Sequence, residues 1–411
     1  MDLHLHKSSI VNLESSIVIT GSKSESNRLL LLQALFPQIE ISNLSDSDDS
    51  QVMQKALNDT SGEIDVHHAG TAMRFLTAYF ATQPNSNIIL TGSSRMKERP
   101  IEVLVTALNN LGADISYLEV QGCPPLKIKG KELIKDKVTL NANVSSQYIS
   151  ALLLMAPKLK NGLELTLEGD ITSVPYIKMT LALLNEIGVK TSFAKNKITV
   201  LPLTTHNFQR ITVESDWSSA SYWYSIIALS DIGTQIELSS YKQNSLQADA
   251  VLVDIYKNFG VSTTFESNAI VLKKIGINLK PQIYNLKDSP DIAQTIAVTC
   301  FGLGSECKLT GLHTLKIKET DRLEALKNEL AKLGANISVN NDSLMLAEQV
   351  LPFGKDLGWA SIATYNDHRM AMAFAPLALK RHLIIEDAMV VSKSYPSFWH
   401  DLKSVGFKIS E

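Results

Sequence analysis

The sequence GSKSESNR at residues 21–28 runs directly into the apolar stretch LLLLQAL. It predicts a polar turn that opens an apolar helix, and Ser22 and Glu25 have the spacing of a capping box. On such a helix, Lys23 lies near Asn27 and Ser24 lies near Arg28. A helix start that gathers cations and hydroxyl groups is typical of an anion site. The alternative is a capped helix with solvated charges.

Similar helix starts recur along the chain at intervals of 73 to 75 residues, at Gly70, Ser145, Ser218, Asp291 and Asn366. A second series runs in phase with them. In this series a glycine follows each of five helix-like runs, at intervals of 72 to 76 residues, at Gly112, Gly188, Gly260, Gly334 and Gly406. Glycine is the residue expected just past a helix end.

These two series predict six copies of one α/β unit, since a period of about 73 residues exceeds that of solenoid repeats. The first copy is shortened, with little room for a strand pair before Gly70. Three copies per half predict two domains, residues 21–214 and residues 1–20 with 215–411. The N-terminal strand then pairs with the C-terminal half. Six polar helix starts facing one cleft would bind small anions, although N-capping alone also favours Ser, Asp and Asn there.

Composition indicates an ordinary globular protein, with 411 residues, 45% apolar and 20% charged residues, and a net charge of −3. No overall field attracts nucleic acid or a membrane, and we expect neither as a partner. Three widely spaced cysteines favour a reducing cytoplasm over a disulfide framework. The N-terminus lacks the apolar core of a signal peptide, and no apolar run is long enough to span a bilayer.

Cationic residues fall at the same phase of the repeat. Any one of them fits a solvated surface charge, but their common phase favours recognition of phosphate and carboxylate groups. The candidates are Lys23, Arg28, Arg74, Arg99, Lys318, Arg322, His368, Arg369 and Lys393.

Asp291 and Glu319 are the carboxylates at these positions, and both are candidates for acid–base chemistry. An N-cap and an ion pair are their structural alternatives. Asp46, Asp48 and Asp49 fit the start of a helix better than a metal site. We expect no metal, and no Walker loop, dinucleotide fingerprint, HExxH or G-x-S-x-G motif is visible.

Eight motifs, in order between residues 21 and 396, resemble the EPSP synthase (3-phosphoshikimate 1-carboxyvinyltransferase) family: GSKSESNR, AGTAMR, RMKERP, VSSQY, SVPY, KIKETDR, TYNDHRMAM and SKSYP. The resemblance implies an inside-out α/β barrel with two domains of three βαβαββ units and an active site in the cleft between them. It also implies enolpyruvyl transfer from phosphoenolpyruvate to the 5-hydroxyl of shikimate 3-phosphate, in the shikimate pathway to aromatic amino acids. The expected chemistry is addition and elimination through a tetrahedral intermediate, without a cofactor.

The motifs also imply roles for individual residues. Shikimate 3-phosphate would be held by Lys23, Ser24, Arg28, Ser145, Ser146, Gln147, Ser173, Tyr176, Asp291 and Lys318. Phosphoenolpyruvate would be held by Lys23, Gly70, Arg99, Gln147, Arg322, His368, Arg369 and Lys393. The catalytic groups would be Asp291 as base for the hydroxyl, Glu319 for the methyl proton, and Lys23, which lies near both substrates.

The chain departs from the family pattern at two positions near the phosphoenolpyruvate subsite, with His68 for the usual Asn and Phe75 for the frequent Pro. One alternative is the sister enzyme that acts on a UDP-amino sugar, but GSSRMKERPIE lacks its catalytic Cys. A silent anion-binding protein is opposed by the presence of Asp291, Glu319 and Lys23. An RNA-end-processing relative is opposed by the net charge. We expect a monomer, since a site built by one chain requires no partner.

Overall fold

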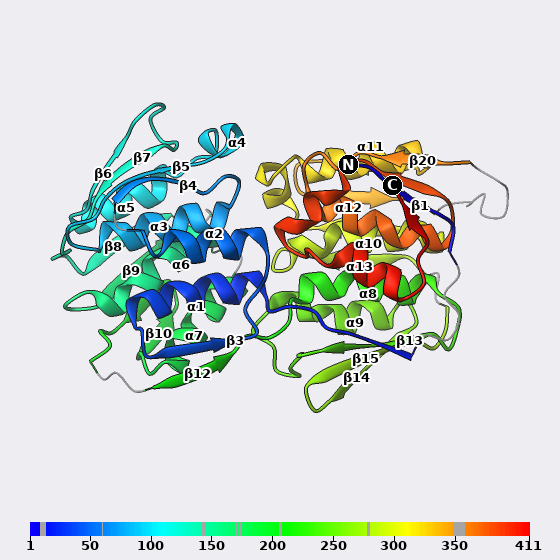
Figure 1. The fold of residues 1–411 in the computed structure, drawn as a ribbon, viewed down its shortest axis with the longest axis horizontal. Helices are drawn as coiled ribbons and strands as arrows, with labels where there is room; N and C mark the ends of the chain where they lie inside the picture. The colour runs from blue at the N-terminus through cyan, green and yellow to red at the C-terminus, as the bar shows by residue number, and fades with distance from the viewer. Residues whose placement is uncertain are drawn as a thin grey trace. The chain divides into compact units, whose positions relative to one another are not determined.

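The computed structural model describes residues 1–8, 14–59, 61–141, 145–169, 171, 174–204, 208–277, 280–348 and 358–411. The chain folds as two compact units (Figure 1). The N-terminal unit is Gly21–Val213, and the C-terminal unit joins Met1–Thr20 to Glu214–Glu411. Both units mix helices with small sheets.

Three copies of one repeat build the N-terminal unit. In the second and third copies, two strands pair in parallel and two more add antiparallel, giving the orders β4-β5-β7-β6 and β8-β9-β11-β10. Among the described residues, the first copy has only the parallel pair of β3 and β12, which confirms that it is shortened.

The elements of the first copy are α1 (Lys23–Leu35), β3 (Ile39–Ser42), α2 (Asp48–Ala56) and the distant β12 (Gln209–Thr212). Those of the second are β4 (Ser61–Asp65), α3 (Gly70–Ala81), β5 (Asn87–Thr91), α4 (Ser94–Lys97), α5 (Glu102–Leu111), β6 (Asp114–Tyr117) and β7 (Leu126–Lys129). Those of the third are β8 (Lys137–Asn141), α6 (Ser146–Met155), the 3₁₀ turn η1 (Ala156–Lys158), β9 (Leu163–Glu168), α7 (Val174–Glu186), β10 (Thr191–Ala194) and β11 (Lys197–Val200).

The C-terminal unit repeats this plan in three four-stranded sheets, β2-β13-β15-β14, β16-β17-β19-β18 and β20-β21-β1-β22. The N-terminal strands complete two of them, because β2 pairs in parallel with β13 while β1 lies antiparallel between β21 and β22. Six copies of one unit are therefore confirmed.

The fourth copy contains β2 (Glu14–Ile17), α8 (Trp217–Leu229), β13 (Gln235–Ser239), η2 (Ala248–Val251), α9 (Leu252–Lys257), β14 (Val261–Glu266) and β15 (Ala269–Lys274). The fifth contains β16 (Gln282–Asn285), η3 (Pro290–Ile292), α10 (Ala293–Leu303), β17 (Cys307–Thr310), η4 (His313–Ile317), α11 (Arg322–Lys332), β18 (Ile337–Val339) and β19 (Leu344–Leu346). The sixth contains β20 (Ala360–Ile362), α12 (His368–Phe374), η5 (Ala375–Leu379), β21 (Leu383–Ile385), η6 (Ala388–Lys393), α13 (Phe398–Ser404), β22 (Ile409–Ser410) and β1 (Leu3–Leu5).

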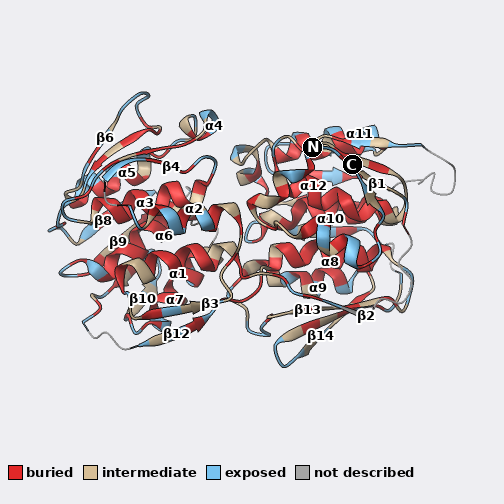
Figure 2. Ribbon diagram, viewed as in Figure 1, coloured by how far each residue is buried: buried red, intermediate tan, exposed pale blue. Residues whose placement is uncertain are grey.

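The helices that open the repeats form the interior of each unit, and the sheets lie outside them (Figure 2). Helix α6 carries no charged residue and is buried at all its positions but Gln147, as expected for a helix that other elements surround. Strand β9 alternates buried and partly exposed residues, as expected for a sheet that covers a core with one face. The helices-inside arrangement agrees with the inside-out α/β fold expected from the sequence.

The five glycines of the second series all have a positive backbone φ, which confirms them as helix-ending residues. Gly112, for example, ends α5 with φ 109°, and Gly334 follows α11 with φ 95°. A residue with a side chain is strained in this conformation, which explains why glycine recurs at this phase.

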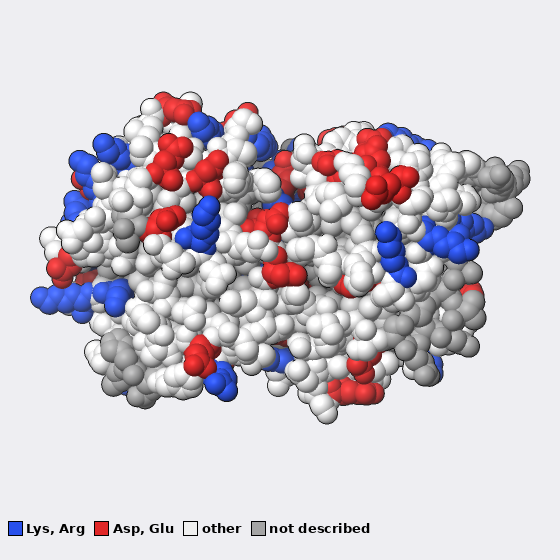
Figure 3. All heavy atoms as spheres, viewed as in Figure 1, with Lys and Arg blue, Asp and Glu red and all other residues white. Residues whose placement is uncertain are grey.

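Across the described residues, no helix combines the length and apolar character needed to cross a membrane. On the face shown in Figure 3, acidic and basic side chains of the described residues are interspersed over each unit. Affinity for small anions must therefore come from local groups of charge.

Candidate functional site

The first helix starts where the sequence predicts, at Lys23, but the side chain of Ser22 does not make its bond of the predicted capping box. Ser22 occupies the N-cap position without a side-chain cap hydrogen bond, and Ala69 likewise leaves α3 without one. The first N–H groups of these two helices are then left for a ligand, which suits an anion site better than capping does. Gly21 is required by close packing, since a Cβ there would lie 1.9 Å from the backbone oxygen of Asn43.

Lys23 lies in the first turn of α1 and pairs with Asp49 rather than with Asn27. Its Nζ is 3.4 Å from Asp49 Oδ2, and its side chain is 17% exposed. Asn27 instead accepts a hydrogen bond from Ser50. Lys23 thus keeps an accessible ammonium group at a helix N-terminus.

Arg28 lies deeper than expected, among the central helices. Its guanidinium donates hydrogen bonds to Thr180 (2.8 Å), Ser150 (3.0 Å) and the backbone oxygen of Ser24 (2.8 Å). It also lies over the rings of Phe75 and Tyr176, at 5.4 and 5.8 Å from their centroids. The residue that departs from the family pattern, Phe75, therefore supplies an aromatic surface for this cation.

Burial lowers the pKa of both Arg28 and Arg74 to about 10. For Arg74 the positive charge of Arg99 adds to this effect. Within the described ranges, neither guanidinium has a carboxylate partner within 4.0 Å. Buried cations that lack a counter-ion favour the arrival of an anion.

Arg99 lies directly over Gly70 at the start of α3. A Cβ added to Gly70 would come within 2.7 Å of Arg99 Nη1, so only glycine permits this approach. Nearby, Gln147 at the start of α6 donates a hydrogen bond to Thr71 Oγ1 at 3.1 Å. Ser145 caps α6 through a long 3.4 Å contact with the backbone nitrogen of Gln147.

The N-terminal unit thus brings Lys23, Ser24, Gly70, Arg99, Ser145, Ser146, Gln147 and Tyr176 to the starts of α1, α3, α6 and α7 or to the segment before α5. The predicted residue Ser173 lies outside the described residues.

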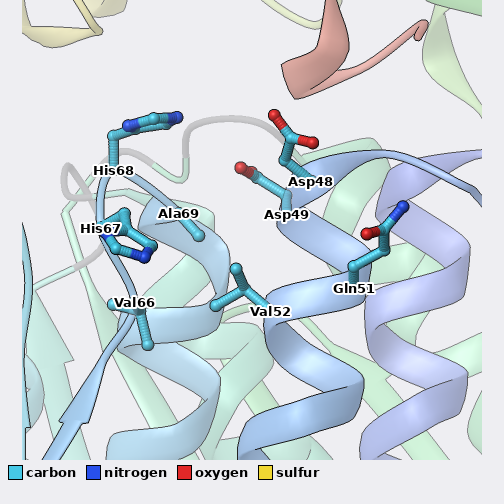
Figure 4. A pocket seen from close by; sticks show the side chains of 8 residues that line it. All are labelled: Asp48, Asp49, Gln51, Val52, Val66, His67, His68 and Ala69. Carbon is cyan, nitrogen blue, oxygen red and sulfur yellow. The ribbon is translucent and has the colours of Figure 1, made fainter.

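A pocket of about 210 Å³ adjoins this region at the start of α2. Figure 4 shows His67 and His68, from the loop before α3, across from Asp48 and Asp49 in the first turn of α2. The prediction that Asp48 and Asp49 belong to a helix start is confirmed. Nowhere in the described part of the chain do three His, Cys, Asp or Glu side chains gather as a metal site.

The C-terminal unit contains a network of buried charges around Arg322, which is only 2% exposed. Arg322 donates to Asp291 (2.9 Å), Glu319 (2.8 Å) and Asp367 (2.6 Å). Hydrogen bonds between ionised groups of this kind are among the strongest hydrogen bonds in proteins. The network draws on the starts of α10, α11 and α12, which lie far apart in the sequence.

Further cations complete this network. Asp291 also contacts Lys318 at 3.4 Å and Arg369 at 3.3 Å, and Lys393 contacts Glu319 at 2.8 Å. His368, the first residue of α12, is buried with its Nδ1 3.7 Å from Asp367. All the candidate residues of the C-terminal half therefore lie in or beside one network.

The electrostatics of the network fix the charge of Asp291. Burial pushes its pKa upward, but Arg369, Lys318 and Arg322 outweigh burial and hold the pKa well below its usual range. The pKa of Arg369 is lowered by burial and, in the balance, raised well above its ordinary value by Asp291. Asp291 is thus a carboxylate at every physiological pH, and a weak base while all three cations hold it.

Asp249 is a member of this region that sequence reasoning missed, since no motif marks it. It is buried in η2, and its Oδ2 accepts a hydrogen bond from Ser218 at 2.5 Å. Its Oδ1 is buried without a hydrogen-bond partner among the described residues. Burial and the nearby Asp291 raise its pKa to about 7.

This raised pKa makes the free energy of unfolding depend on pH. The folded protein holds the Asp249 proton more tightly than the unfolded chain, so the stability that this group contributes is fully present below about pH 4 and is lost as the pH rises through about 7. The Asp249→Asn variant is expected to lack this fall, and to be more stable than the parent at pH 8 by about 2–4 kcal/mol. Chemical denaturation at pH 4, 6 and 8 measures the difference. Asp254→Asn, which changes an exposed carboxylate on α9, is the control. If the difference in the free energy of unfolding between Asp249→Asn and the parent did not change with pH, it would contradict the raised pKa of Asp249.

The chain matches the profile of the family described as EPSP synthase (3-phosphoshikimate 1-carboxyvinyltransferase) over residues 59–402. A 3-phosphoshikimate 1-carboxyvinyltransferase of Bacteroides fragilis (strain YCH46) is 46% identical over 405 residues, covering 97% of this chain and 96% of the relative. That of Haemophilus influenzae (strain Rd) is 35% identical over 434 residues, covering 96% and 97%.

Solved structures share the fold. EPSP synthase from Acinetobacter baumannii superposes with a TM-score of 0.79 at 20% identity, over all of both chains. The enolpyruvyl transferase NikO from Streptomyces tendae gives 0.75 at 14% identity, over all of this chain and 98% of the other. The family profile matches most of the chain, and both relatives are more than 30% identical to it. This chain therefore belongs to the EPSP synthase family.

Proposed function

We propose that this chain transfers the enolpyruvyl group of phosphoenolpyruvate to the 5-hydroxyl of shikimate 3-phosphate. In this proposal, the residues at the helix starts of the N-terminal unit and the charge network around Arg322 in the C-terminal unit serve the same reaction. The products are 5-enolpyruvylshikimate 3-phosphate and phosphate, and the step belongs to the shikimate pathway. The observation that carries the proposal is the Asp291–Arg322–Glu319–Lys393 network, which joins two candidate proton-transfer groups to cations suited to phosphate.

Charge neutralisation supports this substrate pair. Each substrate carries a carboxylate and a phosphate, and a phosphate ester adds roughly −1.5 to −2 at neutral pH. In the proposal, shikimate 3-phosphate is held by Lys23, Ser24, Arg28, Ser145, Ser146, Gln147, Ser173, Tyr176, Asp291 and Lys318. Phosphoenolpyruvate is held by Lys23, Gly70, Arg99, Gln147, Arg322, His368, Arg369 and Lys393.

The proposed chemistry has two steps. In the first, Glu319 in its protonated form gives a proton to the vinyl CH₂ of phosphoenolpyruvate, while the 5-hydroxyl oxygen bonds to the neighbouring carbon and gives its own proton to Asp291. In the second, the carbon–oxygen bond to phosphate breaks and the new methyl group returns one proton to Glu319. Lys23 assists both steps, and Arg322, Arg369 and Lys393 stabilise the charge on the departing phosphate.

Substrate binding itself supplies a way to activate Asp291. Substrate phosphate and carboxylate groups compete for the N–H donors of Arg322 and Arg369, which otherwise hold Asp291 at 2.9 and 3.3 Å. When these cations turn toward substrate, the pKa of Asp291 rises from its depressed value toward the range of a general base. The base is then weak in the ligand-free protein and stronger in the complex.

Release of phosphate tests the proposal. Purified protein is incubated with phosphoenolpyruvate and either shikimate 3-phosphate or UDP-N-acetylglucosamine, and we expect release with shikimate 3-phosphate alone. Release of phosphate with the UDP-sugar alone would contradict the assignment of shikimate 3-phosphate as substrate, but it would still support enolpyruvyl transfer. Binding of phosphoenolpyruvate without release in either mixture would favour a silent anion-binding protein.

A further inference from the structure

The backbone oxygen of Pro100 is held by two side chains from the interior of the N-terminal unit. The hydroxyl group of Tyr148, on α6, donates a hydrogen bond to it at 2.5 Å. Nη2 of Arg74, on α3, makes a longer contact of 3.5 Å with the same oxygen. Tyr148 is 7% exposed and Arg74 is 3% exposed, so both are fixed by their surroundings.

The same pair of side chains also joins this oxygen to the start of α3. Nη1 of Arg74 donates to the backbone oxygen of Gly70 at 3.1 Å, and the Arg74 guanidinium lies 6.0 Å from the centre of the Tyr148 ring. Tyr148, Arg74, Pro100 and Gly70 therefore form one connected group, named here the Pro100 clamp.

The Pro100 clamp holds the backbone directly after Arg99. Arg99 precedes Pro100 in the chain, and its guanidinium lies against Gly70, where an added Cβ would be 2.7 Å from Nη1. In the described residues, Arg99 has no carboxylate within 4.0 Å to orient its side chain. Its position over Gly70 therefore depends on how its backbone is anchored.

We propose that Tyr148 is a positioning residue for phosphoenolpyruvate, acting through the Pro100 carbonyl to hold Arg99 over Gly70. This inference rests on the proposed function, in which Arg99 and Gly70 contact that substrate. A buried hydroxyl is well suited to the task because it fixes a backbone atom from a rigid helix, and a small displacement of a binding group is costly. The hydroxyl of Tyr148 does not itself touch substrate in this scheme.

Removing the hydroxyl alone tests the inference. In the Tyr148→Phe variant, we expect the Kd for phosphoenolpyruvate, measured by calorimetry with shikimate 3-phosphate present, to rise about 3- to 10-fold. The Kd for shikimate 3-phosphate alone is expected to change less than about twofold, since the Tyr148 hydroxyl donates to the Pro100 carbonyl and not to a proposed partner of that substrate. Tyr79→Phe, which removes a hydroxyl from α3 outside the clamp, is the matched control and is expected to behave like the parent.

A double-mutant cycle separates positioning from general packing. In an Arg99→Ala background, the added Tyr148→Phe change is expected to leave phosphoenolpyruvate affinity where Arg99→Ala alone puts it. An unchanged affinity in the single variant, equal losses for both substrates, or an effect that persists without Arg99 would each overturn the inference. Turnover of the parent protein is measured in parallel, so that failure of the proposed function is seen separately. A parent that binds no phosphoenolpyruvate overturns both.

Discussion

The Asp291→Asn variant is expected to lose turnover by roughly 10²- to 10⁴-fold while it continues to bind both substrates. The amide keeps the size of the side chain but cannot accept the proton of the attacking hydroxyl. It also removes the carboxylate that Lys318, Arg322 and Arg369 share at 2.9 to 3.4 Å. These cations are then less occupied, so the affinity for the anionic substrates is expected to be equal or higher. Steady-state kinetics and calorimetry on the same preparation measure the two effects.

The control for this variant is Asp254→Asn, an amide replacement at an exposed position of α9 in the same unit. It is expected to match the parent in turnover and binding. A thermal melt is included because loss of a carboxylate among buried cations also affects folding. Turnover of Asp291→Asn within about tenfold of the parent, from folded protein, would remove Asp291 from the role of base.

The repeat was predictable because each of its signals depends on a short stretch of sequence. Five of the six repeats end a helix with a glycine whose φ is positive, and Gly112 and Gly334 are two members of this regular series. The apolar helix that opens each repeat is equally local, since α6 and α8 carry no charged residue and are buried along most of their length. Periodicity thus reveals the number of units and the shortened first copy.

The arrangement of charges was less predictable because the partners are distant in the chain. The pairing of Arg322 with Glu319 follows from a separation of three residues, but its bond to Asp367 spans 45 residues. Arg28 meets Thr180 across 152 residues, so its burial depends on how the helices pack. Asp249 carries no motif at all, and its raised pKa arises only when folding removes it from water.

The Ser22 bond of the capping box also differs from the prediction. The spacing of Ser22 and Glu25 describes what an isolated helix would gain, whereas Glu25 is buried in the folded protein. The folded helix starts without the Ser22 side-chain bond, which is worth about 1 kcal/mol. The side chain of Ser22 therefore caps no N–H group of α1 beside Lys23, where the proposed chemistry needs a positive site.

Lys23 is the residue whose loss is expected to affect both substrates together. In the Lys23→Met variant, we expect kcat/KM for each substrate to fall by roughly 10³-fold, because one ammonium group supports binding and proton transfer. Methionine keeps most of the length and the apolar stem of lysine, so the start of α1 remains packed. Lys23→Arg is expected to recover much of the binding but little of kcat, since a guanidinium retains its proton and is larger.

Lys55→Met, at an exposed position in the last turn of α2, removes the same charge from the same unit and is expected to leave kinetics unchanged. In Lys23→Met, Asp49 loses its only ion-pair partner among the described residues, and Asp49 is only 3% exposed. The melting temperature of the Lys23→Met variant is therefore measured beside that of the parent. If folded Lys23→Met lost affinity for one substrate only and kept kcat, Lys23 would be a binding residue of one subsite. A fall in kcat with both affinities reduced supports its place beside the reacting atoms.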